Sequence, residues 1–342
     1  MSICRVTVMT FRCCLLLILS GLTIPGGAQD LGKELAGTVE IDGSSTVAPI
    51  STEAADMFNE EFENVRIPVG VSGTGGGFRR FTKGDTDISD ASRPIKESEL
   101  AACRKNKVQF IEIPVAYDGL TIAVNKQNSW VKQLTVEQLG RIFLADNLAT
   151  TWNQVDPSWP AREIKIFSPG TDSGTFDYFR EIVAGKSGSI RPDMAVSEDD
   201  NNLVQGIANT ETAIGFFGAA YYFENKDKLK AVPIVNPAGK AVLPTAETIG
   251  SGEYAPFSRP LFIYVNAKSS RRPEVKLFVR HYLENAADIA EAVGYVGLPE
   301  EIYEIAGQHF EKRKVGTHYW TNDGKPRHGP LSEIYQESNL LK

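Results

Sequence analysis

The sequence contains few cysteines, and most of them lie at its beginning. Three of the four, Cys4, Cys13 and Cys14, belong to the first 14 residues. If that segment is removed on export, Cys103 remains alone and no disulfide can form within the chain. The hydrophobic core must then stabilise the fold by itself, for which a chain of 342 residues is long enough. This length predicts two domains rather than one.

The sequence also lacks a hydrophobic run long enough for a membrane-spanning helix, which takes roughly 20 residues. Its apolar segment 13–22 follows Arg5 and Arg12 and precedes small residues that end at Ala28. This order is typical of a secretory signal peptide, so we expect residues 1–28 to be removed by cleavage near Ala28. The alternative is an N-terminal anchor that is retained. The mature protein is expected to be periplasmic or secreted.

Positive charge is scarce as well, with 36 lysines and arginines against 43 aspartates and glutamates. Removal of residues 1–28 takes away two arginines and leaves 34 against 43, a formal charge of −9. Duplex binding depends on many lysines and arginines that neutralise phosphates, so no nucleic-acid partner is expected. Net charge could not attract a small anion either. Its site would have to be built from local dipoles and one or two cations.

Signatures of metal binding and of catalysis are missing from the sequence. The four histidines lie after residue 280, without the spacing of metal ligands and without a cysteine partner. No serine stands in a GxSxG elbow or can be matched to a nearby histidine and acid. The glycine-rich segment 72–77 has neither the Lys-Ser or Lys-Thr pair of a P-loop nor GxGxxG spacing. The sequence therefore predicts a binding protein without cofactor or metal, not an enzyme.

Strand-like and helix-like segments alternate along the chain, which predicts an α/β fold with a parallel sheet. Short strands near 39–41, 65–71 and 86–91 each run into a polar turn and then a helix. Further along, 120–125 and 261–266 carry leucine, isoleucine, valine and asparagine at matching positions. We interpret these two strands as the places where the chain crosses between two lobes.

The same pattern predicts where individual strands and helices begin and end. The strands 108–115 and 120–125 are predicted to be separate, with a turn between them, and a short helix is predicted over 78–83. The polar segment 316–342 has no periodicity from which its structure could be predicted.

Three segments place hydroxyls and glycines at a predicted strand end just before a predicted helix. Helix N-termini have unpaired N–H groups and a positive dipole end, so each segment could cradle an oxyanion. The simpler interpretations are a flexible glycine loop and an N-cap at Asp172 or Ser173. Three such segments that converged would enclose a tetrahedral anion. The segments are 43–46, 72–77 and 168–175.

Two charged residues add chemistry to these strand ends. The planar fork of Arg93 suits a bidentate contact with an oxyanion. The alternative is a surface arginine paired with Glu97 or Asp90. Asp172 stands beside hydroxyls that donate hydrogen bonds, and it can accept one. Because hydrogen phosphate has a proton to donate and sulfate has none, a buried carboxylate at this place would favour phosphate over sulfate.

From about residue 37 to about residue 283 the chain closely resembles the phosphate-binding proteins of bacterial high-affinity phosphate ABC transporters. The most specific strings are IDGSSTVAPI (41–50), VGVSGTGGGFRRFTKGDTDISDASRPI (69–95), FSPGTDSGTFDYF (167–179) and SRPLFIYVN (258–266). The resemblance implies a two-lobed type II periplasmic-binding fold, in which two mixed sheets flanked by helices are joined by a two-strand hinge. It also implies a monomer that binds inorganic phosphate in an interlobe cleft and delivers it to an inner-membrane permease.

The resemblance further divides the chain and assigns the site. Lobe one comprises 37–118 together with 266–342, and lobe two comprises 119–265. Hydroxyls, backbone groups and two charged side chains from both lobes are expected to contact phosphate. These residues are Ser45, Thr46, Ser72, Thr74, Gly75, Ser92, Arg93, Asp172, Ser173, Gly174 and Thr175.

Two departures from the best-known branch leave the proton acceptor open. That branch has an arginine where this chain has Pro169, and an aspartate near the position of Ser92. The cation and the acceptor are then carried by other loops, and the acceptor is Asp172, Asp90 or neither. The alternative functions are binding of another tetrahedral oxyanion, such as sulfate or molybdate, and a secreted phosphatase-like activity.

Overall fold

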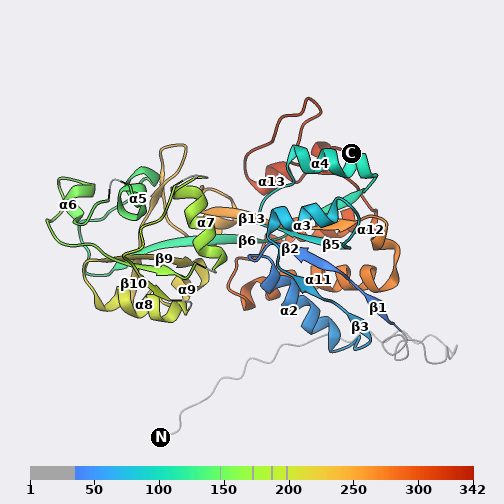
Figure 1. Ribbon diagram of the computed structural model, residues 1–342, viewed down its shortest axis with the longest axis horizontal. Helices are drawn as coiled ribbons and strands as arrows, with labels where there is room; N and C mark the ends of the chain where they lie inside the picture. Colours follow the sequence, from blue (N-terminus) through green and yellow to red (C-terminus); the bar gives the residue numbers. More distant parts are fainter. Residues whose placement is uncertain (1–34, 147, 172, 186–187, 198) are drawn as a thin grey trace, which may run out of the picture.

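The computed structural model describes residues 35–342 except 147, 172, 186–187 and 198. The predicted signal peptide 1–28 and Asp172 lie outside these residues. Figure 1 shows two α/β bodies, with β6 (Phe110–Asn125) and β13 (Ser258–Asn266) running from one to the other. The body that contains both the early and the late parts of the chain is lobe one, and the body formed by the middle of the chain is lobe two.

The strands form one continuous path through both bodies. Besides β6 and β13, it consists of β2 (Ile41–Gly43), β4 (Val69–Gly70), β5 (Ile88–Ala91), β7 (Lys165–Pro169), β8 (Ala195–Ser197) and β9 (Ala213–Gly218). Strand β10 (Leu229–Ala231) lies beside this path. The order is β4-β2-β5-β13-β6-β9-β7-β8, and β10 pairs with β6. Strands β4, β2 and β5 are mutually parallel, as are β9, β7 and β8, whereas β13 and β6 run antiparallel to their neighbours. The predicted α/β class with mixed sheets is confirmed, and the two sheets share β6.

Strand β6 is a single strand of 16 residues, all of them buried. The prediction of two separate strands, 108–115 and 120–125, was therefore wrong. Residues 116–119 continue the strand because they pair with residues 258–261 of β13. Beyond them, β6 pairs with β9 in lobe two from Leu120 onward. The two connections between the lobes therefore lie beside the matching sequences 120–125 and 261–266 rather than within them.

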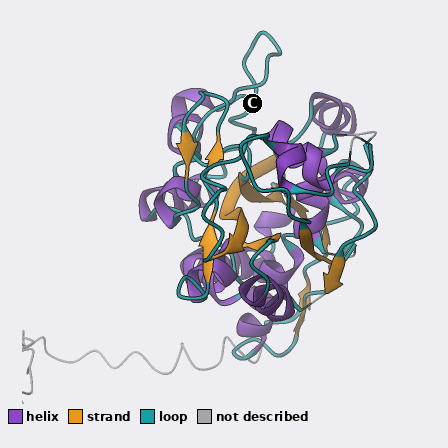
Figure 2. Ribbon diagram, turned by 90° about the vertical axis from the view of Figure 1, so that its left-hand side faces the viewer, coloured by secondary structure: helices purple, strands orange, loops and turns teal. Residues whose placement is uncertain are grey.

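Helices surround the strands, which occupy the interior (Figure 2). The helices of lobe one are α2 (Ala48–Asn59), α3 (Thr74–Phe81), α4 (Glu97–Asn106), α11 (Pro273–Ala292), α12 (Glu300–Glu311) and α13 (Leu331–Ile334). Those of lobe two are α5 (Val136–Phe143), α6 (Trp152–Val155), α7 (Gly174–Val183), α8 (Asp200–Asn209), α9 (Ala219–Glu224) and α10 (Ala246–Gly250). Among the described residues, no helix has the length and apolar character needed to cross a membrane.

Four short strands and two 3₁₀ turns complete the secondary structure of the described residues. Strand β1 (Gly37–Thr38) pairs with β3 (Val65–Arg66), and β11 (Ile234–Val235) pairs with β12 (Ala241–Val242). The 3₁₀ turns are η1 (Ser269–Arg271) and η2 (Glu337–Asn339). None of these elements belongs to the central strand path.

The packing of α11 against α2 holds the start of α2 in place. Helix α11 buries apolar side chains at the three- and four-residue spacing of one helix face. Phe278 on that face makes an edge-to-face contact with Phe58 in the last turn of α2, with ring centroids 5.6 Å apart. At the start of α2, Ser51 Oγ lies 3.2 Å from the hydroxyl of Tyr282 on the same face of α11. Burial of a phenylalanine side chain stabilises a fold by about 1.5–3 kcal/mol. The loop before α2, which carries the first predicted segment, is thus anchored on a rigid helix pair.

The C-terminal segment 316–342 packs onto lobe one. The buried carboxylate of Glu112 in β6 accepts hydrogen bonds from Thr317 Oγ1 at 2.6 Å and from His318 N at 2.8 Å. It also accepts one from the hydroxyl of Tyr264 in β13, at 2.9 Å. A buried carboxylate is costly unless it is hydrogen-bonded, so these donors tie the segment to the two hinge strands.

Candidate functional site

The predicted segments of lobe one lie at one edge of the sheet. Strands β4, β2 and β5 are adjacent and parallel, so their carboxyl ends point the same way. Each of these ends leads through a short loop into a helix, which is α3, α2 and α4 respectively. This is the edge at which open α/β sheets bind ligands.

Hydrogen bonds connect the loops at this edge. Ser44 N donates to the carbonyl of Asp90 at 3.0 Å, which joins the loop after β2 to β5. Thr74 Oγ1 lies 3.1 Å from Ser92 Oγ and accepts from Ser92 N at 3.2 Å. The structure therefore brings together Thr74 and Ser92, two of the predicted site residues from different segments.

The glycine-rich segment is the first turn of a helix rather than a loop. Helix α3 begins at Thr74, four residues earlier than predicted, after Gly73 with a φ of 74° that favours glycine. At Gly77, a Cβ would lie 2.6 Å from the Cα of Gly43, so the helix packs directly on β2. At Gly75, a Cβ would meet no atom within 4 Å, and the residue is exposed. An anion therefore has room to approach the amides of this turn at Gly75.

Ser72 precedes this turn, and its backbone N–H is held in place by a hydrogen bond. Its N–H donates to Oδ1 of Asp42 at 3.1 Å, and Arg80 Nη1 donates to Oδ2 of the same carboxylate at 2.7 Å. Burial raises the pKa of Asp42, but the hydrogen bonds from Arg80 and Ser72 outweigh it, and the net result is a lowered pKa. Asp42 stays ionised and fixes the backbone of the second segment, while Ser72 itself is exposed.

The first segment presents one exposed and one buried hydroxyl residue. Ser45 is exposed, whereas Thr46 is buried. The N–H of Thr46 donates to Ser44 Oγ at 3.2 Å. Thr46 Oγ1 accepts a hydrogen bond from Nη2 of Arg259 at 3.3 Å. Arg259 belongs to β13 and was not identified as a site residue in the sequence.

Arg259 connects this segment to the hinge and to lobe two. Its Nε donates to Oδ2 of Asp118 in β6 at 3.1 Å, and its guanidinium carbon lies 3.7 Å from the ring centroid of Tyr178 in α7. Its side chain is only 15% exposed and that of Asp118 only 3%. Burial raises the pKa of Asp118, and the adjacent guanidinium counteracts part of that effect. The only sequence signal for Arg259 is its place in the string 258–266, which was part of the family resemblance.

The third segment leads from β7 into α7. Ser173 is the N-cap, and its hydroxyl accepts from the N–H of Thr175 at 3.2 Å. The N-cap interpretation is therefore confirmed for Ser173, and Gly174 is the first residue of the helix. Tyr178 follows within the same helix, so α7 reaches the guanidinium that also contacts Thr46. Asp172 lies outside the described residues.

Arg93 is engaged by an acidic partner. Its Nη1 and Nη2 donate to the two carboxylate oxygens of Glu99 at 2.9 and 2.8 Å. The guanidinium also lies 5.5 Å from the ring centroid of Phe78. An acidic partner for Arg93 was one alternative from the sequence, but the partners named there, Glu97 and Asp90, were wrong, because the acid that binds it is Glu99. Contact with a ligand requires Arg93 to leave or to share this carboxylate.

Asp90, the other candidate acceptor, is completely buried. Its Oδ1 accepts from Ser51 Oγ at 3.0 Å, and its Oδ2 has no partner among the described residues. Burial raises the pKa of Asp90 to about 7. The carboxyl lies beneath the loops rather than at their surface.

The described part of the chain contains no group of three histidine, cysteine or acidic residues that could hold a metal ion. The rings of His309 and His318 are stacked, with centroids 5.1 Å apart and an interplanar angle of 4°. Both are buried, and burial lowers the pKa of His309 to about 4. These two histidines are therefore part of the buried interior of lobe one.

Comparison with known proteins adds sequence relatives to this geometry. The profile of the PBP superfamily domain matches residues 28–285. Protein SphX of Synechococcus elongatus is 48% identical over 281 residues, which cover 82% of this chain and 83% of the relative. Phosphate-binding protein PstS of Staphylococcus saprophyticus is 42% identical over 287 residues, which cover 84% of this chain and 88% of the relative.

Solved structures agree with these relatives. A possible phosphate binding protein from Planctomyces limnophilus superposes with a TM-score of 0.79 at 42% identity, covering 82% of this chain and 99% of that chain. An ABC-type phosphate transport receptor from Vibrio cholerae gives a TM-score of 0.63 at 25% identity, covering 77% and 100%.

Proposed function

The chain belongs to the PBP superfamily and, within it, to the phosphate-binding proteins related to SphX and PstS, and on this premise we propose its function. It binds one inorganic phosphate ion between its two lobes and delivers the ion to the permease of an ABC transporter. Relatives named for phosphate binding and for phosphate transport support this ligand and this partner. The protein acts as a monomer outside the cytoplasmic membrane, after cleavage near Ala28, and catalyses no reaction.

The position of Arg259 is the observation that carries this proposal. Its guanidinium contacts Thr46, just before α2, and the ring of Tyr178, in the second turn of α7. An oxyanion held between the N-termini of these two helices would lie beside a cation that already contacts both elements. Helix N-termini and a planar guanidinium are each suited to tetrahedral oxyanions.

Both lobes contribute donors in the proposed site. Lobe one supplies Ser45, Thr46, Ser72, Thr74, Gly75 and Ser92, and lobe two supplies Ser173, Gly174 and Thr175. Closure of the two lobes about β6 and β13 would remove water from the ion. Hydrogen bonds to a charged group contribute about 1.5–3 kcal/mol each. Several of them reach the roughly −8 kcal/mol of micromolar affinity after desolvation costs.

Arg93 is proposed as a second cation of the site, and Asp172 as the acceptor of the phosphate proton. Arg93 is held by Glu99, so phosphate would compete with that carboxylate for the guanidinium. Asp90 is a weaker acceptor because its carboxyl is fully buried and its Oδ1 is engaged by Ser51. A carboxylate at position 172 would accept a hydrogen bond from hydrogen phosphate but not from sulfate.

Calorimetric titration with phosphate, arsenate, sulfate and molybdate tests the ligand. We expect one site that binds phosphate and also arsenate, which like phosphate carries a proton. Sulfate should bind to the same site at least a hundredfold more weakly. The variant Arg259→Lys keeps the positive charge beside Asp118 but loses the planar guanidinium. Its affinity for phosphate should be at least tenfold lower. Arg162→Lys, at an exposed ion pair with Glu211, is the matched control and should bind normally. Tighter binding of sulfate or molybdate than of phosphate would show that phosphate is not the ligand. Turnover of a phosphomonoester would overturn the assignment as a binding protein.

A further inference from the structure

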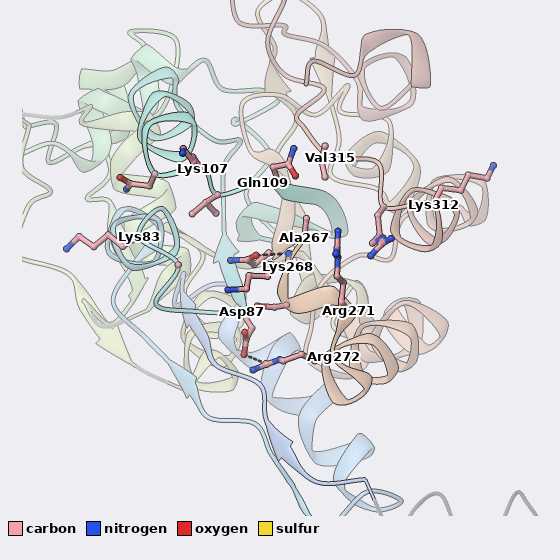
Figure 3. Close-up of a pocket in the computed structure, with 16 residues that line it drawn as sticks. Lys83, Asp87, Lys107, Gln109, Ala267, Lys268, Arg271, Arg272, Lys312 and Val315 are labelled. Carbon is pink, nitrogen blue, oxygen red and sulfur yellow. Dashed lines mark hydrogen bonds and ion pairs between the residues drawn. The ribbon is translucent and has the colours of Figure 1, made fainter.

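A polar pocket lies at the end of lobe one opposite to the phosphate segments (Figure 3). It is lined by residues that precede β5 and β6 and by residues that follow β13, including Asp87, Gln109 and Ala267. The phosphate segments follow the carboxyl end of β5, so the pocket is at the opposite edge of the same strands. Its volume is about 1040 Å³.

Positive charge is concentrated in this pocket, although the chain as a whole has a net charge of −7. One acidic residue lines it, Asp87, and that carboxylate is paired with Arg272 at 2.6 Å. Six more basic side chains line the pocket, and among the described residues none of them has an ion-pair partner. They are Lys83, Lys107, Lys268, Arg271, Lys312 and Arg313.

Helix ends account for only part of this charge. The C-termini of α3, α4 and α12 lie beside Lys83, Lys107 and Lys312, and cations are favourable at such ends. Each helix end carries about half a negative charge, so the three together offset about one and a half of the six positive charges. Lys268 and Arg271 belong to no helix C-terminus of this kind, because they lie between β13 and α11. The remaining cations repel one another in the absence of a ligand.

Backbone conformation singles out the same pocket. Among the described residues, the two that are not glycine and have positive φ are Lys107, at 58°, and Arg313, at 46°. Both line the pocket. Residues other than glycine are disfavoured in this left-handed region, and glycine is the usual residue just after a helix. At both positions, therefore, a cation lines the pocket where glycine would be less strained.

The lining of the pocket limits the class of ligand. None of the described residues that line it is aromatic, so it has no platform on which a nucleobase could stack. The cavity is as large as sites that hold organic ligands, and larger than one oxyanion needs. In Figure 3 the labelled cations are spread across the view from Lys83 to Lys312, with Lys268 and Arg271 between them. An extended anion with several charged groups fits this arrangement better than a single ion does.

We propose that this pocket binds a short condensed phosphate, a flexible chain of a few phosphate units. Lys268 and Arg271 contact its middle, and Lys107 and Arg313 contact it from the ends of α4 and α12. The site is separate from the proposed orthophosphate site, and the proposal does not depend on that function. Affinity is dominated by charge and falls steeply as salt concentration rises.

Calorimetry with inorganic triphosphate tests this proposal on the mature protein. Saturating orthophosphate is present throughout, so that the interlobe site is filled, and EDTA removes metal ions that bind triphosphate. We expect one saturable site. The double variant Lys268→Glu and Arg271→Glu should lower the affinity for triphosphate at least tenfold. Its affinity for orthophosphate, measured separately, should stay within twofold of wild type. The matched control, Lys126→Glu with Lys132→Glu, changes net charge equally at exposed positions of lobe two and should bind triphosphate within twofold of wild type.

A second variant separates binding from folding. Lys107→Gly relieves the left-handed conformation, so its melting temperature should be unchanged or higher, while its affinity for triphosphate falls at least threefold. Absence of saturable triphosphate binding, or equal loss in the control variant, would overturn the proposal. Binding to phosphatidylglycerol vesicles without binding to triphosphate would also overturn it, and would assign the surface to a membrane instead.

Discussion

Arg259 Nη2 lies 3.3 Å from Thr46 Oγ1, although the two residues are 213 positions apart in the chain. The same guanidinium is hydrogen-bonded to Asp118, so one side chain joins the start of α2 to both hinge strands. A ligand that displaces Thr46 from Arg259 would alter contacts at the hinge itself. We expect phosphate binding and lobe closure to be coupled through this arginine.

The first prediction concerns Arg93. Arg93→Ala should weaken phosphate binding at least tenfold, because a bidentate guanidinium contact is lost. Glu99→Gln should strengthen binding, since it releases the guanidinium that this carboxylate now holds. Calorimetry measures both, with Arg104→Ala, an exposed arginine of α4, as the control. Unchanged affinity in Arg93→Ala would remove this residue from the site.

The second prediction concerns ligand selectivity at Asp172. Asp172→Asn should erode the preference for phosphate over sulfate by at least tenfold, with a much smaller effect on thermal stability. The carboxylate repels sulfate and accepts the proton of hydrogen phosphate, whereas an amide can donate to both anions. Competition titrations provide the measurement. Asp177→Asn, in the first turn of α7, controls for the helix-dipole effect, and an equal change in both variants would refute the acceptor role.

The third prediction is a pH dependence of stability that originates at Asp90. Between its ordinary value of 3.8 and about 7, this buried carboxyl keeps a proton that the unfolded chain releases. The free energy of unfolding therefore falls as pH rises through this range, by at most about 1.4 kcal/mol per pH unit from this group. Asp90→Asn should remove the contribution, as measured by denaturant unfolding at pH 5 and pH 7.5.

A histidine acts in the opposite direction over the same range. Burial lowers the pKa of His309 to about 4, so this residue makes the protein less stable as pH falls below 6.5. The comparison of Asp90→Asn with wild type at each pH cancels this effect, since both proteins contain His309. Identical pH slopes in the two proteins would show that Asp90 is ionised in the folded state.

The fourth prediction concerns the attachment of the C-terminal segment. Glu112→Gln should lower the free energy of unfolding by about 2–3 kcal/mol, because an amide cannot accept from all the donors that surround the carboxylate. Phosphate affinity should change less than twofold. The control, Glu337→Gln, removes an exposed ion pair with Lys314 and should leave the free energy of unfolding nearly unchanged. A large loss of phosphate affinity in Glu112→Gln would mean that the segment affects the site directly.

The sequence predicted the fold class and most of the segments, because these depend on local periodicity and on turn chemistry. It misplaced the start of α3, since the packing of Gly77 against Gly43 is a tertiary contact that allows glycines inside a helix. It separated β6 into two strands because the continuous pairing of 116–119 with β13 is a long-range contact. For the same reason it missed Arg259, whose partners Thr46, Asp118 and Tyr178 are distant in the chain.

In the proposed complex, segments from both lobes meet around one tetrahedral anion beside Arg259. Anomalous diffraction at the arsenic edge, from a crystal of the protein with bound arsenate, locates that anion directly. We expect a single strong peak within hydrogen-bond reach of Thr46, Thr74 and Ser173. A peak that contacts one lobe alone, or that lies away from all three residues, would contradict it.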